Sequence, residues 1–177
     1  MSRKEARERV FQLVFERVTT QERNELTLEK FIRKLPDSAV YIQSVYDGLD
    51  ARLDFFVNQI SRYAKGFSGE RIFKVDLSLL LVATYEILFV DDVPERVAIN
   101  EALDLVKRYS TEKSAAYING ILANFVKEKE RILHIFTHGE EEEREGEEGE
   151  NEDSKSEGGE VENGAATVEE LQTTNDE

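Results

Sequence analysis

The side chains best suited to binding chemistry stand at the start of the chain, in Arg3, Lys4 and Arg7. On a helix, their spacing of one and four positions places the three cations on one face. Cations at a helix N-terminus oppose the macrodipole, so helix stability does not account for them. One interpretation is a surface that holds phosphate groups. The alternative is an ordinary solvated charged face, to which Glu5 and Glu8 also belong.

Residues suited to catalysis or metal binding are scarce. The sequence has no cysteine, no GxGxxG or GxxxxGK[ST] loop to cradle a phosphate, and no paired carboxylates placed for acid–base work. His134 and His138 have a spacing that could bind a metal, but no third ligand is evident. We therefore predict a binding protein without a cofactor or a metal, and not an enzyme.

Hydrophobic periodicity predicts helices throughout the first 138 residues and no convincing strand. Pro94 suits a first helical position, and Ser110 or Thr111 can cap the helix that follows. The stretch 75–90 is apolar nearly all round, and its length favours a buried central helix. The predicted helices cover residues 3–18, 25–35, 38–64, 75–90, 94–109 and 110–136, with a turn at 71–73 and a loop at Gly66–Gly69. We predict an all-α fold of about seven helices in two small bundles, divided near this loop.

Two glycines fall inside predicted helices. Gly48 is interpreted as a close crossing of two helices. Gly120 should cost about 1 kcal/mol in a helix interior unless a close approach compensates.

The charge is divided unevenly along the chain. The 177 residues include 38 acidic and 23 basic side chains, a net charge of −15, but residues 140–177 hold 17 of the acids and only 2 of the bases. That leaves 21 of each sign in residues 1–139, so any basic patch there is local. We predict a folded domain at 1–138 and a disordered acidic tail at 139–177, because few bulky apolar residues offset the entropy of ordering that tail.

The expected location is the cytoplasm. The absence of cysteine fits a reducing compartment, and the charged start of the chain does not resemble a signal peptide. The most apolar run, at 75–90, is interrupted by acids and is too short to span a bilayer. The sequence therefore favours a soluble protein.

The segment VPERVAINEALDLVKRY followed by STEKSAAYINGIL, at 93–122, resembles the C-terminal signature of the NusB transcription-antitermination family. The sequence ARERVFQLVF, at 6–15, resembles the first helix of the same family. The resemblance implies an all-helical RNA-binding protein. A NusB-like domain also begins an RNA cytosine methyltransferase family, but that chemistry needs a cysteine nucleophile and a large cofactor domain, which this sequence lacks.

From the resemblance we expect RNA to contact the N-terminal cations and three residues of the C-terminal helix pair: Arg3, Lys4, Arg7, Lys107, Lys113 and Tyr117. The cations would hold phosphates, and the tyrosine could stack on an unpaired base. Tyr117 could equally pack in a helix interface, and Lys107 could simply compensate a helix dipole. Lys113 departs from the best-known family member, which has an acid there. A lysine should strengthen RNA contact or change its preference.

The resemblance also implies a protein partner, the small-subunit ribosomal protein that doubles as NusE. The pair binds the boxA element of nascent transcripts, chiefly of ribosomal RNA operons, and supports processive antitermination by RNA polymerase. The implied partner contacts here are Phe15, Asp76 and Glu86, since carboxylates suit a basic ribosomal protein. Alternatively, Asp76 is a first-turn acid and Glu86 a solvated residue at a helix edge. The rival function is a helical protein–protein adaptor of the same fold without RNA binding.

The acidic tail departs from the family, whose members typically end close to the last helix. A disordered polyanion could visit the RNA surface and compete with nonspecific phosphates. A tail that only improves solubility would have the same composition, so both interpretations stay open.

Overall fold

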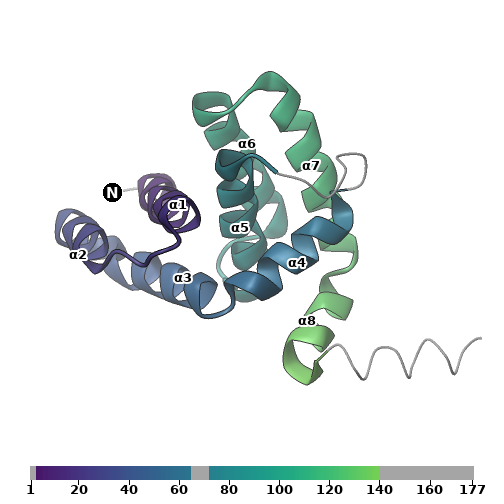
Figure 1. The fold of residues 1–177 in the computed structure, drawn as a ribbon, viewed down its shortest axis with the longest axis horizontal. Coiled ribbons are helices and arrows are strands. Elements are labelled where there is room, and N and C mark those ends of the chain that lie inside the picture. Colours follow the sequence, from purple (N-terminus) through teal and green to yellow (C-terminus); the bar gives the residue numbers. More distant parts are fainter. Residues whose placement is uncertain (1–2, 65–71, 140–177) are drawn as a thin grey trace, which may run out of the picture. The chain divides into compact units, whose positions relative to one another are not determined.

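The computed structural model describes residues 3–64 and 72–139, and within these ranges the regular structure is entirely helical (Figure 1). The helices are α1 (Arg3–Thr20), α2 (Glu25–Lys34), α3 (Ala39–Ala51), α4 (Leu53–Tyr63), α5 (Lys74–Phe89), α6 (Glu95–Tyr109), α7 (Glu112–Lys127) and α8 (Lys129–His138), with a short 3-10 helix, η1 (Pro36–Ser38). The all-α prediction is confirmed, with eight α-helices in these ranges where about seven were expected. The predicted loop at Gly66–Gly69 and the acidic residues from Glu140 onward lie outside the described residues.

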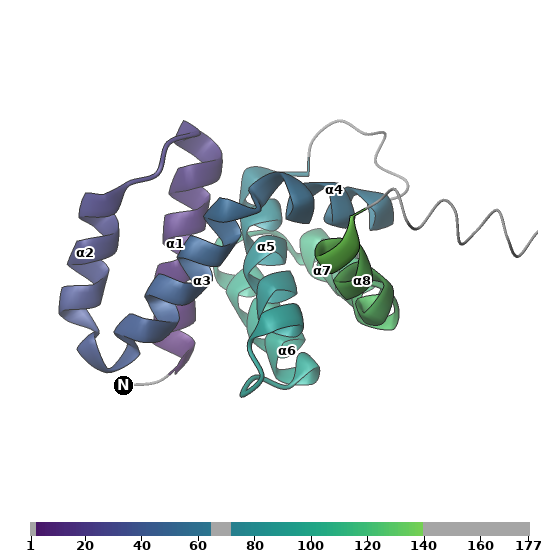
Figure 2. The ribbon, with the colours of Figure 1, turned by 90° about the horizontal axis from the view of Figure 1, so that it is seen from below.

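Helix α5 forms the centre of the core, as its continuous apolar sequence predicts. Eleven of its 16 residues are buried, and α1, α3, α4, α6 and α7 all pack against it. Figure 2 places α1, α2 and α3 on one side of α5, and α4, α7 and α8 on the other. Even so, no helix in the described part of the chain is both long and apolar enough to cross a membrane.

Two predicted helices are divided in the structure. The expected helix at 38–64 turns at Arg52, whose φ is −134°, between α3 and α4. The expected helix at 110–136 divides at Glu128 between α7 and α8. The Arg52 guanidinium lies 5.1 Å from the centroid of the Phe136 ring on α8, so packing between distant helices accompanies the first break. Neither break carries a glycine or proline, which is why the sequence predicts continuous helices.

The division at Arg52 also changes which helices pack together. Helix α3 packs against α1, α2 and α5, whereas α4 packs against α5 and α7. Apart from the central α5, the main neighbours of the chain therefore change at Arg52. The predicted division, near residues 66–69, assigned all of 38–64 to the N-terminal half.

The helix starts in the C-terminal pair follow the sequence closely. Thr111 caps α7, and its Oγ1 accepts a hydrogen bond of 3.2 Å from the Ser114 amide. Pro94 is the residue directly before α6, one position from the predicted place. The side-chain cap of Thr111 and the fixed φ of Pro94 therefore mark where these helices begin.

The two helical glycines have different surroundings. A Cβ built at Gly48 would lie 2.2 Å from Tyr85 Oη, which confirms a close crossing of α3 and α5. The Tyr85 ring is fixed there between Phe56 and Phe89, with centroid distances of 5.8 and 5.3 Å. A Cβ at Gly120 would meet no atom of the described residues within 4 Å. No packing contact in the described chain therefore requires a glycine at that position.

We expect Gly48→Ala and Gly120→Ala to change stability in opposite directions. Alanine favours a helix over glycine by about 0.8–1.0 kcal/mol, and at position 120 this should raise the free energy of unfolding. At position 48 the methyl group would displace the Tyr85 ring, and overpacking of this kind costs about 1–3 kcal/mol. Urea unfolding of both variants measures the changes. A Gly48→Ala protein more stable than the wild type would contradict the close crossing.

Candidate nucleic-acid interface

Lys4 on α1 and Lys107 on α6 both bond to the same carboxylate, that of Asp104 on α6. The carboxylate of Asp104 accepts hydrogen bonds from both, at 2.9 Å from Lys4 Nζ and 3.2 Å from Lys107 Nζ. These bonds lower the pKa of Asp104, and the bond with Asp104 raises the pKa of Lys4. The two lysine side chains are 50% and 72% exposed. The structure thus brings two predicted RNA contacts from distant parts of the sequence to one exposed surface.

Arg3 also lies at the surface, at the start of α1. Its Nη2 is 2.5 Å from Asp92 Oδ2 in the turn between α5 and α6, and its guanidinium lies 4.4 Å from the centroid of the Tyr41 ring. The Arg3 side chain is 40% exposed. A phosphate bound to Arg3 would therefore have to compete with the carboxylate of Asp92.

Arg7 forms a buried ion pair with Glu86 of α5. The Arg7 side chain is 3% exposed, and its Nε and Nη2 make three hydrogen bonds of 2.8–3.0 Å to the buried Glu86 carboxylate. Arg7 Nη1 donates to Glu101 at 3.1 Å, and Tyr41 Oη donates to Glu86 at 2.7 Å. Burial opposes the charge on Arg7, but the hydrogen bonds with Glu86 together with the charges of Glu86, Tyr41 and Glu101 outweigh it, so the pKa of Arg7 is raised. Burial, followed by the Glu86 charge, raises the pKa of Tyr41.

This pair corrects two predictions. Arg7 does not share an exposed face with Arg3 and Lys4, because it lies on the buried face of α1 that includes Val10. Glu86 is not a solvated edge residue, because α5 is buried on that side as well. In this conformation the Arg7 guanidinium is closed to RNA and the Glu86 carboxylate is closed to a protein partner.

A pocket of about 280 Å³ opens where the start of α5 meets the start of α7. Asp76 lies in the first turn of α5, as predicted, but is buried. It accepts hydrogen bonds from Ser110 Oγ at 2.5 Å and Ser114 Oγ at 2.7 Å, which tie the α6–α7 turn to α5. The residues that line the pocket are Ile72, Phe73, Asp76, Thr111, Lys113, Ser114 and Tyr117. Two predicted RNA contacts, Lys113 and Tyr117, therefore share one pocket with a predicted partner contact.

The pocket combines aromatic surface with a cation. The Phe73 side chain is 72% exposed, Tyr117 is half-buried and Lys113 is exposed. Burial, followed by the charge of Asp76, raises the pKa of Tyr117. Lys107 lies in the last turn of α6, just before the turn that Asp76 holds. Such a surface can stack an unpaired base and hold the neighbouring phosphates.

Of the three predicted partner contacts, Phe15 alone keeps exposed surface. It is half-buried on α1, and its ring centroid lies 6.3 Å from that of Phe11. Phe11 packs in turn against Tyr109 of α6, with the two ring centroids 4.9 Å apart. Asp76 and Glu86, by contrast, have exposed fractions of 2% and 0%.

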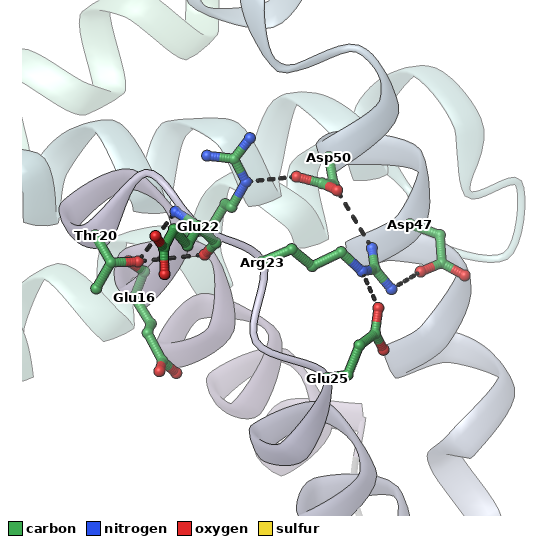
Figure 3. A network of polar contacts seen from close by, with 8 residues as sticks. Glu16, Thr20, Glu22, Arg23, Glu25, Asp47 and Asp50 are labelled. Carbon is green, nitrogen blue, oxygen red and sulfur yellow. Dashed lines mark hydrogen bonds and ion pairs between the residues drawn. The ribbon is translucent and has the colours of Figure 1, made fainter.

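An ion-pair network that the sequence did not reveal joins the α1–α2 turn to α3 (Figure 3). Arg23 lies 2.5 Å from Asp47 and 3.5 Å from Asp50, and it also bonds to Glu25. Arg17 Nε lies 2.6 Å from the same Asp50 carboxylate. The bonds with Glu25 and Asp47 raise the pKa of Arg23. The network fixes α2 against α3. The one signal in the sequence is the spacing of Asp47 and Asp50 on a single helix face.

The histidine pair carries no metal-site geometry within residues 3–64 and 72–139. His134 and His138 stack with their ring centroids 4.4 Å apart at the end of α8. Across these ranges, no three histidine, aspartate or glutamate side chains converge as potential metal ligands.

Comparison with known proteins places the chain in a family. Residues 4–127 match the NusB family. The chain is 38% identical over 130 residues to the transcription antitermination protein NusB of Listeria monocytogenes serotype 4b, covering 72% of this chain and 98% of that protein. It is 43% identical over 89 residues to the protein of the same name from Clostridium kluyveri, covering 50% of this chain and 57% of that one. A solved structure of T. maritima NusB matches with a TM-score of 0.67 and 33% identity, over 72% of this chain and 92% of that one. The chain therefore belongs to the NusB family.

Proposed function

We propose that the chain is a transcription antitermination factor that binds boxA-type single-stranded RNA together with the ribosomal protein NusE. The relatives described above carry the name transcription antitermination protein, and membership of their family supports the same role here. The RNA would be nascent transcript, mainly ribosomal, and the complex would support processive transcription by RNA polymerase. The protein would act in the cytoplasm by binding alone, without a catalytic step.

The observations that support RNA binding best are the exposed Lys107 in the last turn of α6 and the pocket of Lys113 and Tyr117 at the start of α7. Both lysines flank the α6–α7 turn, which the bonds to Asp76 hold in place. A fixed turn presents the two cations and the aromatic ring without a cost for ordering the backbone on binding. Lys4, and beyond it Arg3, would extend this surface along α1 for further phosphates.

The proposed NusE contact centres on Phe15. Its half-buried ring can add apolar area to an interface, whereas Asp76 and Glu86 are buried and would act indirectly. Asp76 would hold the α6–α7 turn, and Glu86 would hold α1 against α5 through Arg7. Partner binding and RNA binding would then share the same rigid frame.

Binding of a boxA-like RNA to the full chain, with and without NusE and at several salt concentrations, tests this function. We expect NusE to tighten RNA binding, and affinity to fall steeply with salt because several phosphates are neutralised. A scrambled RNA of equal length measures nonspecific binding. Binding of NusE without any RNA binding would leave a helical adaptor as the function.

A further inference from the structure

A second hollow lies at the far end of α7, where the last turns of α4 and α7 meet the start of α8. Its volume is about 530 Å³. The residues that line it are Arg62, Tyr63, Asn124, Lys127, Glu128 and Arg131. Three cations and one carboxylate therefore surround a polar groove, although residues 1–139 as a whole are neutral.

Arg131 is held in position within this groove. Its Nε donates to Glu128 at 2.9 Å, and its Nη2 donates to Tyr63 Oη at 3.1 Å. The Tyr63 ring packs edge-on against the buried Phe125, with centroids 6.2 Å apart. Arg62 and Lys127 are exposed beside it. The groove thus combines a guanidinium bonded to Glu128 and Tyr63 with two further cationic residues that are exposed.

Helix dipoles explain why a cation stands at each helix end, but they do not explain why these cations converge. Arg62 lies in the last turn of α4 and Lys127 in the last turn of α7, where a positive charge is favoured. That preference does not require the two helix ends to converge with Arg131 on one hollow. Convergence of this kind is what a bound phosphate group needs.

The groove lies in line with the pocket of Lys113 and Tyr117 along α7. Lys113 and Lys127 are close to four helical turns apart, so they lie near the same face, separated by about 21 Å. Gly120 stands midway on that face, and a Cβ there would meet no described atom within 4 Å. A few nucleotides of an extended strand could cover this distance along this face of α7.

We propose that the Arg62–Lys127–Arg131 groove binds backbone phosphates of RNA that runs along α7 from the Tyr117 pocket. This inference rests on the proposed RNA-binding function and extends it by a second phosphate site. The aromatic residue in the groove's lining, Tyr63, packs against Phe125 and accepts a hydrogen bond from Arg131, so the groove would hold the backbone without reading the bases. It would therefore add affinity for a longer RNA and leave sequence preference to the first site.

The test compares a short boxA-like RNA with the same RNA extended at either end. The variant is Arg62→Gln/Lys127→Gln, which spares Arg131 because of its bonds to Tyr63 and Glu128. Lys30→Gln/Lys34→Gln on the exposed side of α2 is the control with the same change of charge. Thermal unfolding confirms that each protein is folded, and affinities are measured with NusE present between 50 and 200 mM salt.

We expect one extension to tighten binding to the wild type and the α2 control, and to add nothing for the groove variant. The salt slope is the steepness with which the logarithm of the affinity falls as the logarithm of the salt concentration rises. Loss of two phosphate contacts should lower this slope by about 1.4. The wild type should therefore lose about sevenfold more affinity than the groove variant across this salt range. Equal gains in all three proteins would overturn the groove while leaving boxA binding intact. Failure of the wild type to bind either RNA would instead overturn the proposed function and the groove together.

Discussion

Replacing Arg7 with methionine should lower the free energy of unfolding by about 3–5 kcal/mol, because the buried Glu86 carboxylate would lose its counter-charge. Three hydrogen bonds now join the two side chains, and Tyr41 Oη would be the one donor left to Glu86 among those described. Arg33→Met is the control, since Arg33 pairs with Glu29 in solvent at 3.9 Å. Urea unfolding should show a much smaller loss for the control. Equal losses of unfolding free energy in the two variants would show that the buried pair stabilises the fold no more than an exposed pair does.

The double variant Arg7→Met/Glu86→Leu separates structure from RNA contact. Replacing both members of a buried ion pair with apolar residues is often neutral or stabilising, so the double variant should recover a large part of the loss. Its RNA affinity and salt slope should match those of the wild type if Arg7 only holds α1 against α5. A slope lower by about 0.7 would mean that Arg7 reaches a phosphate after all.

The burial of Arg7 illustrates what the sequence could and could not predict. The charge pattern of α1 places Arg7 with Arg3 and Lys4, and nothing nearby in the sequence identifies its partner. Glu86 lies 79 residues away, on a helix that is apolar nearly all round. Burial of the pair is decided by how α1 packs on α5, which is tertiary information. Asp104 was within reach of sequence reasoning, because its spacing of three to Lys107 is a usual helical ion pair.

The helices themselves were mostly predictable, because periodicity and capping are local. The starts of α5, α6 and α7 lie within about two residues of the expected positions. The breaks at Arg52 and Glu128 were not predictable, because apolar residues such as Leu49, Leu53 and Phe56 keep a helical spacing across the first of them. Packing with other helices, as in the contact of Arg52 with the Phe136 ring, accompanies the change of direction.

Neutralising Lys107 and Lys113 should weaken RNA binding through the salt-dependent part of the affinity. Both lysines are exposed and flank the α6–α7 turn, so Lys107→Gln/Lys113→Gln should leave the fold intact. If each holds one phosphate, the salt slope should fall by about 1.4 for single-stranded RNA. Lys30→Gln/Lys34→Gln on α2 again gives the same change of charge at another place. Equal slopes for the two variants would show only a general effect of net charge.

Tyr117 should act by a different physical route, which its substitutions can reveal. Loss of one base–aromatic stack costs about 1–3 kcal/mol, so Tyr117→Leu should weaken RNA binding about 5- to 150-fold with an unchanged salt slope. Leucine still fills much of the half-buried site, and thermal unfolding checks that the fold survives. Tyr117→Phe keeps the ring and should bind almost as tightly as the wild type. If the Tyr117→Leu and Tyr117→Phe proteins bind RNA equally well, Tyr117 serves only to pack α7 against its neighbours. The base must then stack on another side chain of the pocket, and the exposed Phe73 is the first residue to substitute.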